Sequence, residues 1–308
     1  MAARARALNA FEAAAGRSEA REARTLWRQA WRRLLRNRLA LAGGVFVLVI
    51  GAISILAPWA APYDPIKQYY DAINQGPSSL HWLGTDGLGR DQLSRLIVGA
   101  KTSMTVGIFT QLVIVAIGVP IGAVAGFAGG RVDNLLMRFT DVMYAFPDLL
   151  LIILLRSALI GTPLSGSIYV IFLAIGLASW VGVARLIRGQ VLSLKEKEFV
   201  LAARSMGASS SRILAVHLFP NALAPVIVAV TFGVPRAIFA EAALSYIGIG
   251  ITPPEPSWGT MIQDGYQAIF AYPHMVLFPG VAIALLMMAF TFLGDGLRDA
   301  LDPWMTKT

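Results

Sequence analysis

The sequence predicts an all-α polytopic membrane protein with six transmembrane helices. Of its 308 residues, 56% are hydrophobic and only 14% are charged, whereas a soluble domain carries about 25% charged residues. A helix needs about 20 apolar residues to cross the roughly 30 Å of hydrocarbon in a bilayer. Six stretches of the chain meet or approach this length: residues 39–61, 102–128, 142–160, 168–184, 222–251 and 275–294.

The distribution of Lys and Arg predicts the orientation of these spans. Residues 1–38 contain ten arginines and residues 185–217 contain six basic residues, but the connection between the first two spans, residues 62–101, contains four. Cytoplasmic loops are enriched in Lys and Arg, so we expect both termini and the 185–217 segment in the cytoplasm and residues 62–101 outside. This topology accounts for the net charge of +8, and nucleic acid is not an expected partner.

The first 38 residues are expected to form a cytoplasmic basic tail. They do not resemble a cleavable signal, since three glutamates precede the first apolar stretch. Apolar residues recur at helical spacing among the last arginines of the tail: Trp27, Trp31, Leu34 and Leu35. This pattern suits an amphipathic helix on the inner membrane surface that leads into the first span, although a simple basic flank that anchors the span explains it equally well.

Several kinds of chemistry are not expected in this chain. It has no cysteine, which excludes disulfides and cysteine-ligated zinc, and its three histidines, His81, His217 and His274, are too far apart in sequence to suggest a metal site. No segment matches the phosphate-binding pattern G-x-x-x-x-G-K-[ST], and no Ser-His-Asp or paired-carboxylate arrangement stands out. We therefore expect a non-enzymatic chain that binds no metal or cofactor itself.

The predicted external segment, residues 62–101, contains the string GTDGLGRDQLSRL. Its glycines permit turns, and Asp91 can cap a following helix whose apolar side holds Leu93, Leu96 and Ile97. A calcium loop is the alternative for a glycine-rich segment with carboxylates, but the EF-hand spacing is absent.

The second predicted span carries glycines at every fourth position: Gly118, Gly122, Gly126 and Gly130. In a helix they would form one smooth ridge that lets a neighbouring helix approach closely, inside the bundle or between subunits. Residues 131–141, which follow, are predicted to be a short inner loop, and Pro147 suits the first turn of the third span.

Residues 196–221, EKEFVLAARSMGASSSRILAVHLFPN, are a polar stretch between two apolar ones. Gly207 is expected to end a first short helix, and serines 209–211 can cap a second one that runs to Pro220. A helix–turn–helix with small residues at its apex suits insertion into a cleft of another protein, and an amphipathic surface linker is the alternative. One apolar face of the first helix is predicted to consist of Phe199, Ala202, Ala203 and Met206.

This loop resembles the EAA loop in the membrane subunits of ATP-binding-cassette (ABC) importers. That pattern is Glu-Ala-Ala, three residues, Gly, and then twelve residues to a Pro. The sequence keeps the spacing at Ala202, Ala203, Gly207 and Pro220, but Leu201 occupies the place of the usual Glu and removes one polar contact to the partner. The string EAALSYIG that begins at Glu241 has similar letters, but it lies within a predicted span and its glycine is one residue too far.

Two further strings, WLGTDGLGRDQLSRLIVGAKTS and ALSYIGIGITPPEPSWGTMI, resemble the C-type permease subunit of dipeptide and oligopeptide importers. The resemblance covers roughly residues 31–304. It implies a type I ABC importer permease fold in a prokaryotic cytoplasmic membrane, with a five-helix permease core over residues 102–296 and a cytoplasmic tail over residues 297–308. The external motif of this family falls on Gly84, Thr85, Asp86, Gly89, Arg90 and Asp91.

The resemblance also implies a role and partners. The chain would be a permease subunit of an ATP-driven importer of di- or oligopeptides, together with a homologous second permease, two ATPase subunits or domains that bind ATP and Mg, and an extracytoplasmic binding protein. Relatives that carry nickel complexes, glutathione or oligosaccharides leave the cargo open. A self-sufficient secondary transporter is less expected, because no inverted repeat is evident. The implied ATPase-coupling residues are Glu198, Leu201, Ala202, Ala203, Gly207, Ala208 and Pro220.

Arg156, Arg236 and Glu241 fall within predicted spans. Exposing a charge to lipid is costly, so these residues are candidates for the translocation pathway. Arg156 has a second interpretation, in which its side chain reaches the lipid headgroups, because Gly161 and a proline soon end its span. Arg236 and Glu241 are five residues apart, about 140° around a helix, so they are not required to pair.

Overall fold

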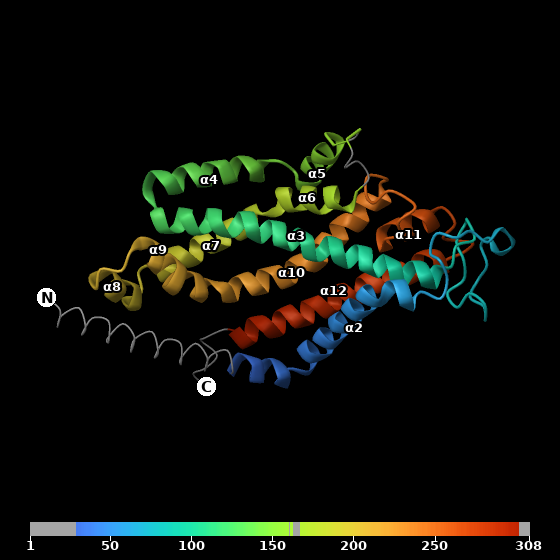
Figure 1. The fold of residues 1–308 in the computed structure, drawn as a ribbon, viewed down its shortest axis with the longest axis horizontal. Helices are drawn as coiled ribbons and strands as arrows, with labels where there is room; N and C mark the ends of the chain where they lie inside the picture. The colour runs from blue at the N-terminus through green and yellow to red at the C-terminus, as the bar shows by residue number, and fades with distance from the viewer. Residues whose placement is uncertain (1–28, 160, 163–166, 302–308) are drawn as a thin grey trace.

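The computed structural model describes residues 29–159, 161–162 and 167–301. The described residues are mostly helical and contain no strand, which confirms the predicted all-α class. Most helices run along the long axis of an elongated molecule (Figure 1). Their order is α2 (Arg38–Ala60), the 3-10 turn η1 (Tyr70–Ala72), α3 (Gln92–Ala128), α4 (Gly130–Ala145), α5 (Asp148–Ser157), α6 (Ile168–Ser179), α7 (Val181–Leu194), α8 (Glu198–Ser205), α9 (Ser210–Arg212), the π-helical turn η2 (Ile213–Leu218), α10 (Phe219–Tyr246), α11 (Trp258–Tyr266) and α12 (His274–Leu301).

Among the described helices, four are long and apolar enough to cross a membrane, and five if α6 and α7, which meet at 45°, form one broken span. The four are α2, α3, the helix from Ser210 to Tyr246, and α12. The predicted count of six is not reproduced because residues 142–160 do not form one helix. Pro147 restricts the residue before it, so α4 ends at Ala145 and α5 starts at Asp148 with only ten residues.

The predicted inner loop over residues 131–141 is instead part of α4. An acidic residue in the first turn stabilises a helix, and Asp133 occupies that position. The Nε and Nη2 atoms of Arg188 in α7 donate hydrogen bonds of 2.6 and 2.7 Å to the Asp133 carboxylate. These bonds lower the pKa of Asp133, which lies outside the predicted spans. The ion pair thus fixes α4 against α7.

The longest helix, α3, begins further out than the predicted span. The side chain of Asp91 accepts a hydrogen bond from the Ser94 backbone N–H and caps the helix at Gln92, as predicted. The external helical segment and the second span are therefore one helix of 37 residues, about 55 Å long at 1.5 Å per residue. It contacts α2, α4, α6, α7, α10, α11 and α12, so α3 is the central element of the fold.

The glycines of α3 form a ridge of three. Gly118, Gly122 and Gly126 face α7, and a Cβ atom at Gly118 would lie only 2.8 Å from the Trp180 carbonyl oxygen. Gly130 does not belong to this ridge: α3 ends at Ala128, and Gly130 opens α4 with nothing near its missing Cβ. The ridge is thus a seam between two helices of the same chain.

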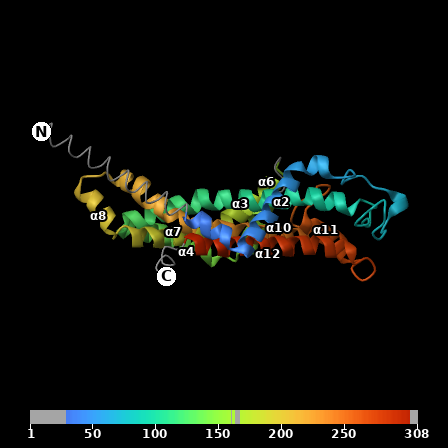
Figure 2. The same ribbon diagram turned by 90° about the horizontal axis from the view of Figure 1, so that it is seen from below.

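The two ends of the described chain pack together. Helices α2 and α12 lie side by side in both views (Figures 1 and 2), and Gly43 of α2 sits against the backbone of Ala289 in α12. Helix α12 continues to Leu301, so the first part of the predicted tail is helical. Residues 29–36 are also helical, and Leu34 packs near Gly296. Trp27 of the predicted amphipathic helix lies outside the described residues.

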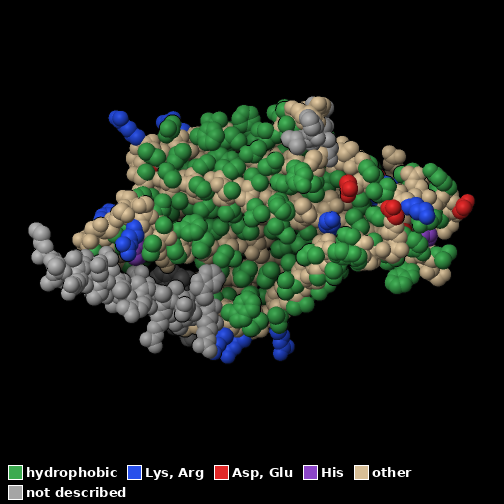
Figure 3. Space-filling model, viewed as in Figure 1, with side chains coloured by type: hydrophobic (Ala, Val, Ile, Leu, Met, Phe, Trp, Pro, Cys, Tyr) green, Lys and Arg blue, Asp and Glu red, His purple; other side chains and the backbone are tan. Residues whose placement is uncertain are grey.

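Charged side chains are separated along the long axis. In Figure 3 hydrophobic side chains cover the middle of the molecule. Lys and Arg are in view at the end that carries α8, along the lower edge and also toward the opposite end, whereas the acidic side chains in view lie toward that opposite end. We call the end opposite α8 the external end, after the orientation that the sequence predicts; it consists of residues 61–91 and α11. The apolar band between the two ends is the part of the surface that suits a bilayer.

The glycine ridge generates a stability prediction. Gly122→Ala places a Cβ against the carbonyl group of Ala184, which is backbone and cannot rotate away. We expect the free energy of unfolding to fall by about 1–3 kcal/mol, as for other overpacked interiors. The measurement is the thermal unfolding midpoint in mild detergent.

Gly182→Ala is the matched control, because Gly182 lies on α7 and no atom lies within 4 Å of the place that its Cβ would occupy. Alanine favours a helix over glycine by about 0.5–1 kcal/mol, so this variant should melt at or above the parent. A Gly122→Ala variant that melts as high as Gly182→Ala would contradict the seam.

Candidate functional site

Helix α8 and the turn after it form the compact loop that the sequence predicts. Gly207 has a φ of +84°, the left-handed conformation that glycine adopts at little cost. The Ala208 N–H donates to the Ala203 carbonyl and the Gly207 N–H donates to the Arg204 carbonyl, both at 3.0 Å. This is a Schellman motif. It ends α8 at a defined place and turns the chain back toward the bundle.

The second helix of the loop does not stop at Pro220. Ser209 caps α9, with its hydroxyl accepting from the Arg212 N–H, and α9, η2 and α10 then continue as one helix from Ser210 to Tyr246. Pro220 has no N–H to donate, and the π-helical turn directly before it accommodates the altered bonding. The loop is therefore joined to a membrane-spanning helix without a break.

The buried side of α8 agrees with the predicted one at Phe199 and Ala203 and differs from it at Ala202. Val200 and Ala203 pack on Ile213 and Leu218 in a common hydrophobic cluster, whereas Ala202 is exposed. A Val200–Ala203 stripe at i, i+3 was the sequence signal that would have found this face. Of the predicted coupling residues, Ala203 is buried and Ala208 is half-buried, and five are exposed: Glu198, Leu201, Ala202, Gly207 and Pro220.

Leu201 stands out on the exposed face of the loop. It occupies the position where the resembling pattern has Glu, and 46% of its surface is exposed. Ala202 and Gly207 beside it carry little or no side chain, and nothing lies within 4 Å of a Cβ at Gly207. The apex thus offers a small, partly apolar, sterically open surface, which is suited to a cleft in another protein.

The external motif is a tightly folded turn. Gly84 and Gly89 both have positive φ, at +78° and +73°, and each approaches backbone too closely for any side chain, Gly84 at Gln75 and Gly89 at Tyr69. The Thr85 hydroxyl donates to the Ala72 carbonyl and accepts from the Gln75 N–H. The glycines are thus required by geometry, and the motif is a folded unit within the external end.

The charged residues of this motif join the external segment to α11. The Asp86 carboxylate accepts from the Nε of Arg90 at 2.7 Å. Arg90 and Arg95 each donate through Nη2 to the same oxygen of Asp264 in α11, both at 2.7 Å. Arg95 is only 2% exposed. The sequence indicated neither Arg95 nor Asp264, because these partners lie 169 residues apart in the chain.

The three charged candidates for the pathway lie in different settings. Arg236 is exposed on α10, as expected of a side chain that faces a pathway or a partner. Arg156 is half-buried near the end of α5, and its Nη2 donates a long 3.4 Å hydrogen bond to Thr252. Glu241 is completely buried, so its carboxylate points into the protein and not to a surface that a solute reaches in this conformation.

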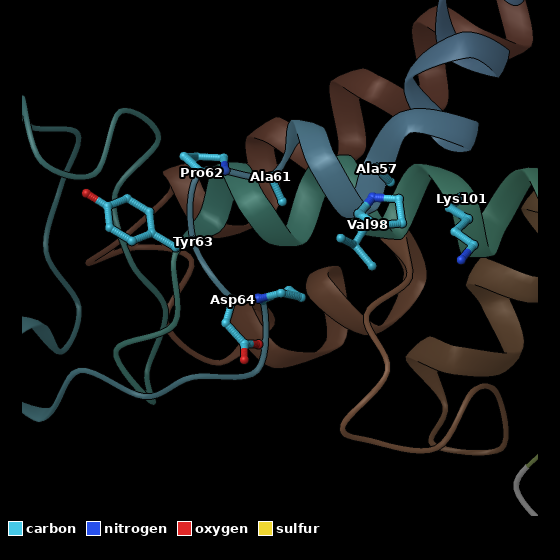
Figure 4. Close-up of a pocket in the computed structure, with 9 residues that line it drawn as sticks. Ala57, Ala61, Pro62, Tyr63, Asp64, Val98 and Lys101 are labelled. Atoms are coloured by element: carbon cyan, nitrogen blue, oxygen red, sulfur yellow. The ribbon is translucent and has the colours of Figure 1, made fainter.

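A pocket of about 420 Å³ lies where α2 meets α3 near the external end (Figure 4). It contains side chains of opposite charge, Asp64 and Lys101, and it includes none of the residues predicted as sites. Its other lining residues are Ala57, Pro58, Ala61, Pro62, Tyr63, Pro65 and Val98.

Comparison with known proteins identifies the family. Residues 118–307 match the family described as binding-protein-dependent transport system inner membrane component, and residues 25–77 match the N-terminal transmembrane domain of oligopeptide transport permease C. The chain belongs to this family of ABC importer permeases.

Individual relatives extend over nearly the whole chain. The oligopeptide transport system permease protein OppC of Bacillus subtilis (strain 168) is 41% identical over 304 residues, which is 97% of this chain and 98% of that protein. The dipeptide permease protein DppC of the same organism is 43% identical over 90% of this chain and 86% of its own length. The glutathione permease protein GsiD of Pectobacterium atrosepticum is 42% identical over 91% of this chain and 92% of its own length.

A solved structure shares the fold. The inward-facing methionine ABC transporter MetNI aligns with a TM-score of 0.54 at 18% identity, over 68% of this chain and 96% of the matched chain. The similarity confirms the predicted type I ABC importer permease fold.

The ion network at the external end generates a second prediction. Asp264→Ala leaves Arg90 and the buried Arg95 without their shared 2.7 Å partner. Removing one partner of a fully buried ion pair costs about 3–5 kcal/mol. Asp264 is itself one-third exposed, so we expect a loss of about 2 kcal/mol in the free energy of unfolding, measured by thermal or denaturant unfolding in detergent.

Asp141→Ala is the control, because Asp141 pairs with Arg185 at the same 2.7 Å but the two side chains are 65% and 39% exposed. Such a pair contributes about 0–1 kcal/mol. Equal losses in the two variants would show that the external network is no more than a surface ion pair.

Proposed function

We propose that this chain is the permease subunit of an ATP-driven, binding-protein-dependent importer of di- or oligopeptides. It would form half of the translocation pathway in a prokaryotic cytoplasmic membrane, with both termini and the 196–221 loop in the cytoplasm. The observation that supports this most strongly is the 41% identity to an oligopeptide permease over 97% of the chain. The excess of basic residues near α8 supports the orientation.

The proposed assembly contains four further components. A homologous second permease completes the pathway, two cytoplasmic ATPase subunits or domains bind ATP and Mg, and an extracytoplasmic binding protein delivers the cargo. The family description supports the need for a binding protein. The open apex around Leu201, Ala202 and Gly207 supports docking of an ATPase at the loop.

In this proposal the loop converts ATP-driven movement into a change of the pathway. Closure of the two ATPases would draw the coupling loops of the two permeases together, and the pathway would open to the outside by rigid-body motion. The continuous helix from Ser210 to Tyr246 supports this mechanism, because the second half of the loop and α10 belong to the same helix. Hydrolysis of ATP on the partner chains would then reset the cycle.

Glutathione is the second candidate cargo. The GsiD relative, a glutathione permease, is 42% identical, close to the 41% and 43% of the two peptide permeases. Glutathione is itself a tripeptide, so a single pathway chemistry suits both cargoes. The separate binding protein would make the choice between them.

The coupling role predicts the behaviour of Gly207→Val. Valine is β-branched and strained at a φ of +84°, so the turn should open and the loop should leave its docking position. When the tagged parent is purified from native membranes in mild detergent, we expect a second permease and ATPases with Walker motifs in the mass spectrum. The variant should retain the permease but lose most of the ATPase.

Gly207→Asn is the control at the same position, because asparagine tolerates the left-handed conformation far better than valine. It should retain the ATPases. If the parent purifies alone and still moves peptide in liposomes, the importer assignment is wrong. If Gly207→Val binds ATPase as well as Gly207→Asn does, the turn is not required for docking.

Arg236 provides a test of the pathway. An exposed arginine in the middle of α10 would attract the carboxylate of a passing peptide and lower its energy there, as charged residues in membrane pathways do. We expect Arg236→Gln to slow uptake of peptides with a free C-terminal carboxylate more than uptake of C-terminal amides, with ATPase content unchanged. Transport in proteoliposomes with both peptide types is the measurement.

Arg156→Gln is the matched control, since Arg156 is half-buried and hydrogen-bonded to Thr252. It should reduce uptake of the two peptide types equally or not at all. Equal uptake of both peptide types by Arg236→Gln would remove Arg236 from the pathway.

A further inference from the structure

Glu241 in α10 is a buried carboxylate held by three serines. It is 0% exposed. Its Oε1 atom accepts hydrogen bonds from the hydroxyls of Ser245 and Ser257, both at 2.7 Å, and its Oε2 atom accepts from the hydroxyl of Ser103 at 3.3 Å. Within the described residues no Lys, Arg or His forms an ion pair with it. The Glu241 carboxylate therefore has hydroxyl groups as its hydrogen-bond donors, and it links the helices to which those serines belong.

The three serines come from three helices. Ser103 lies in α3, Ser245 lies one turn beyond Glu241 in α10, and Ser257 is the residue that caps α11. The Ser257 hydroxyl also accepts from the backbone N–H of Thr260, which completes a capping box. The Glu241 carboxylate thus lies at the N-terminus of α11, where the helix dipole favours negative charge.

Helix α11 is fitted closely to its neighbours at this point. A Cβ at Gly259 would lie 2.5 Å from the Cα of Ala242 in α10, and a Cβ at Gly99 of α3 would lie 3.1 Å from the ring of Trp258. At the other end of α11, Asp264 binds Arg90 and Arg95. If α11 moved away from α10, the buried Glu241 carboxylate would lose one of its two 2.7 Å donors, and leaving a buried acceptor without a partner is costly.

The same helix that carries Glu241 begins at the loop. Ser210 and Glu241 are 31 residues apart in one continuous helix, about 46 Å at 1.5 Å per residue. We propose that Glu241 is a positioning residue that fastens α11 to the outer part of α10, so that movement of the loop displaces α11 at the external end. The proposal rests on the proposed function for the source of the movement.

The test is a comparison of Glu241→Gln with Glu241→Leu in the reconstituted complex of both permeases and the ATPases. Glutamine keeps Oε1 as an acceptor for Ser245 and Ser257, and its amide can donate to Ser103. We expect it to transport at close to the parental rate. Leucine removes all three bonds, so transport should fall by about tenfold relative to ATP turnover, within the usual range of coupling energies.

The attachment of α11 to α10 can also be tested by measuring the distance between these two helices. The chain has no cysteine, so spin labels at Ile247→Cys and Gln267→Cys report the separation of the end of α10 from the end of α11. Both positions are exposed. In the parent and in Glu241→Gln the distance distribution should be narrow and should not change with ATP. In Glu241→Leu it should broaden and shift with ATP.

Thr231→Val is the control on the same helix, because the Thr231 hydroxyl donates only to the Ile227 carbonyl one turn earlier. It should leave the distance and the ratio of transport to ATP turnover unchanged. If Glu241→Leu does not assemble, Ser257→Ala, which removes the α11 donor together with the side-chain cap of α11 but leaves Ser103 and Ser245 in place, is judged by the same two measurements.

Three results would overturn the proposal: a ratio of transport to ATP turnover in Glu241→Leu that matches Thr231→Val, a Glu241→Gln variant as impaired as Glu241→Leu, or a label distance in Glu241→Leu that is the same as in the parent. If the parental complex shows no ATP-driven transport, the proposed function fails, and the label distance still decides whether Glu241 fastens α11.

Discussion

The close approach of α3 to α7 is the constraint on which the rest of the structure depends. In lipid there is little hydrophobic drive to bring helices together, so contact between backbones must supply much of the association. Gly118, Gly122 and Gly126 allow this contact because they place no side chain between the helices. Helix α7 occupies one side of α3, and helices α10, α2 and α12 also pack on α3. The loop that follows α7 is then held at one end of the molecule.

The sequence predicts the features that depend on local chemistry. The bounds of α2 and the core of α3 follow from apolar length, the start of α3 follows from Asp91, and the end of α8 follows from Gly207. Features that depend on distant partners are not visible there. Arg90 binds Asp264, which lies 174 residues further along the chain. The spacing of apolar residues within a short segment cannot predict a contact between two such distant residues. The break between α4 and α5 at Pro147 is an intermediate case. Proline is a local indication of a helix end, but the apolar residues on both sides of it favoured one continuous span.

The external end and the loop end differ in which residues are buried and which are exposed. Beside the external end, two buried ionisable residues have polar partners: Arg95 pairs with Asp86 and Asp264, and Glu241 accepts hydrogen bonds from serine hydroxyls. An enclosed polar network resists rearrangement because each group would lose its partners together. At the loop end, the residues at the apex are small or apolar and open to solvent. The contacts at the external end thus favour a rigid structure, whereas the exposed apex at the loop end is suited to binding a partner.

The distance in sequence between Arg90 and Asp264 has a consequence for biosynthesis. The arginine leaves the ribosome 174 residues before its partner, and at about 5–20 residues per second this interval lasts about 10–35 s. During that time the external segment lacks the Asp264 carboxylate that binds Arg90. The segment therefore remains without this partner until α11 has been synthesised. A mutation that ends synthesis before α11 would give a chain in which Arg90 and Arg95 have no Asp264 to bind.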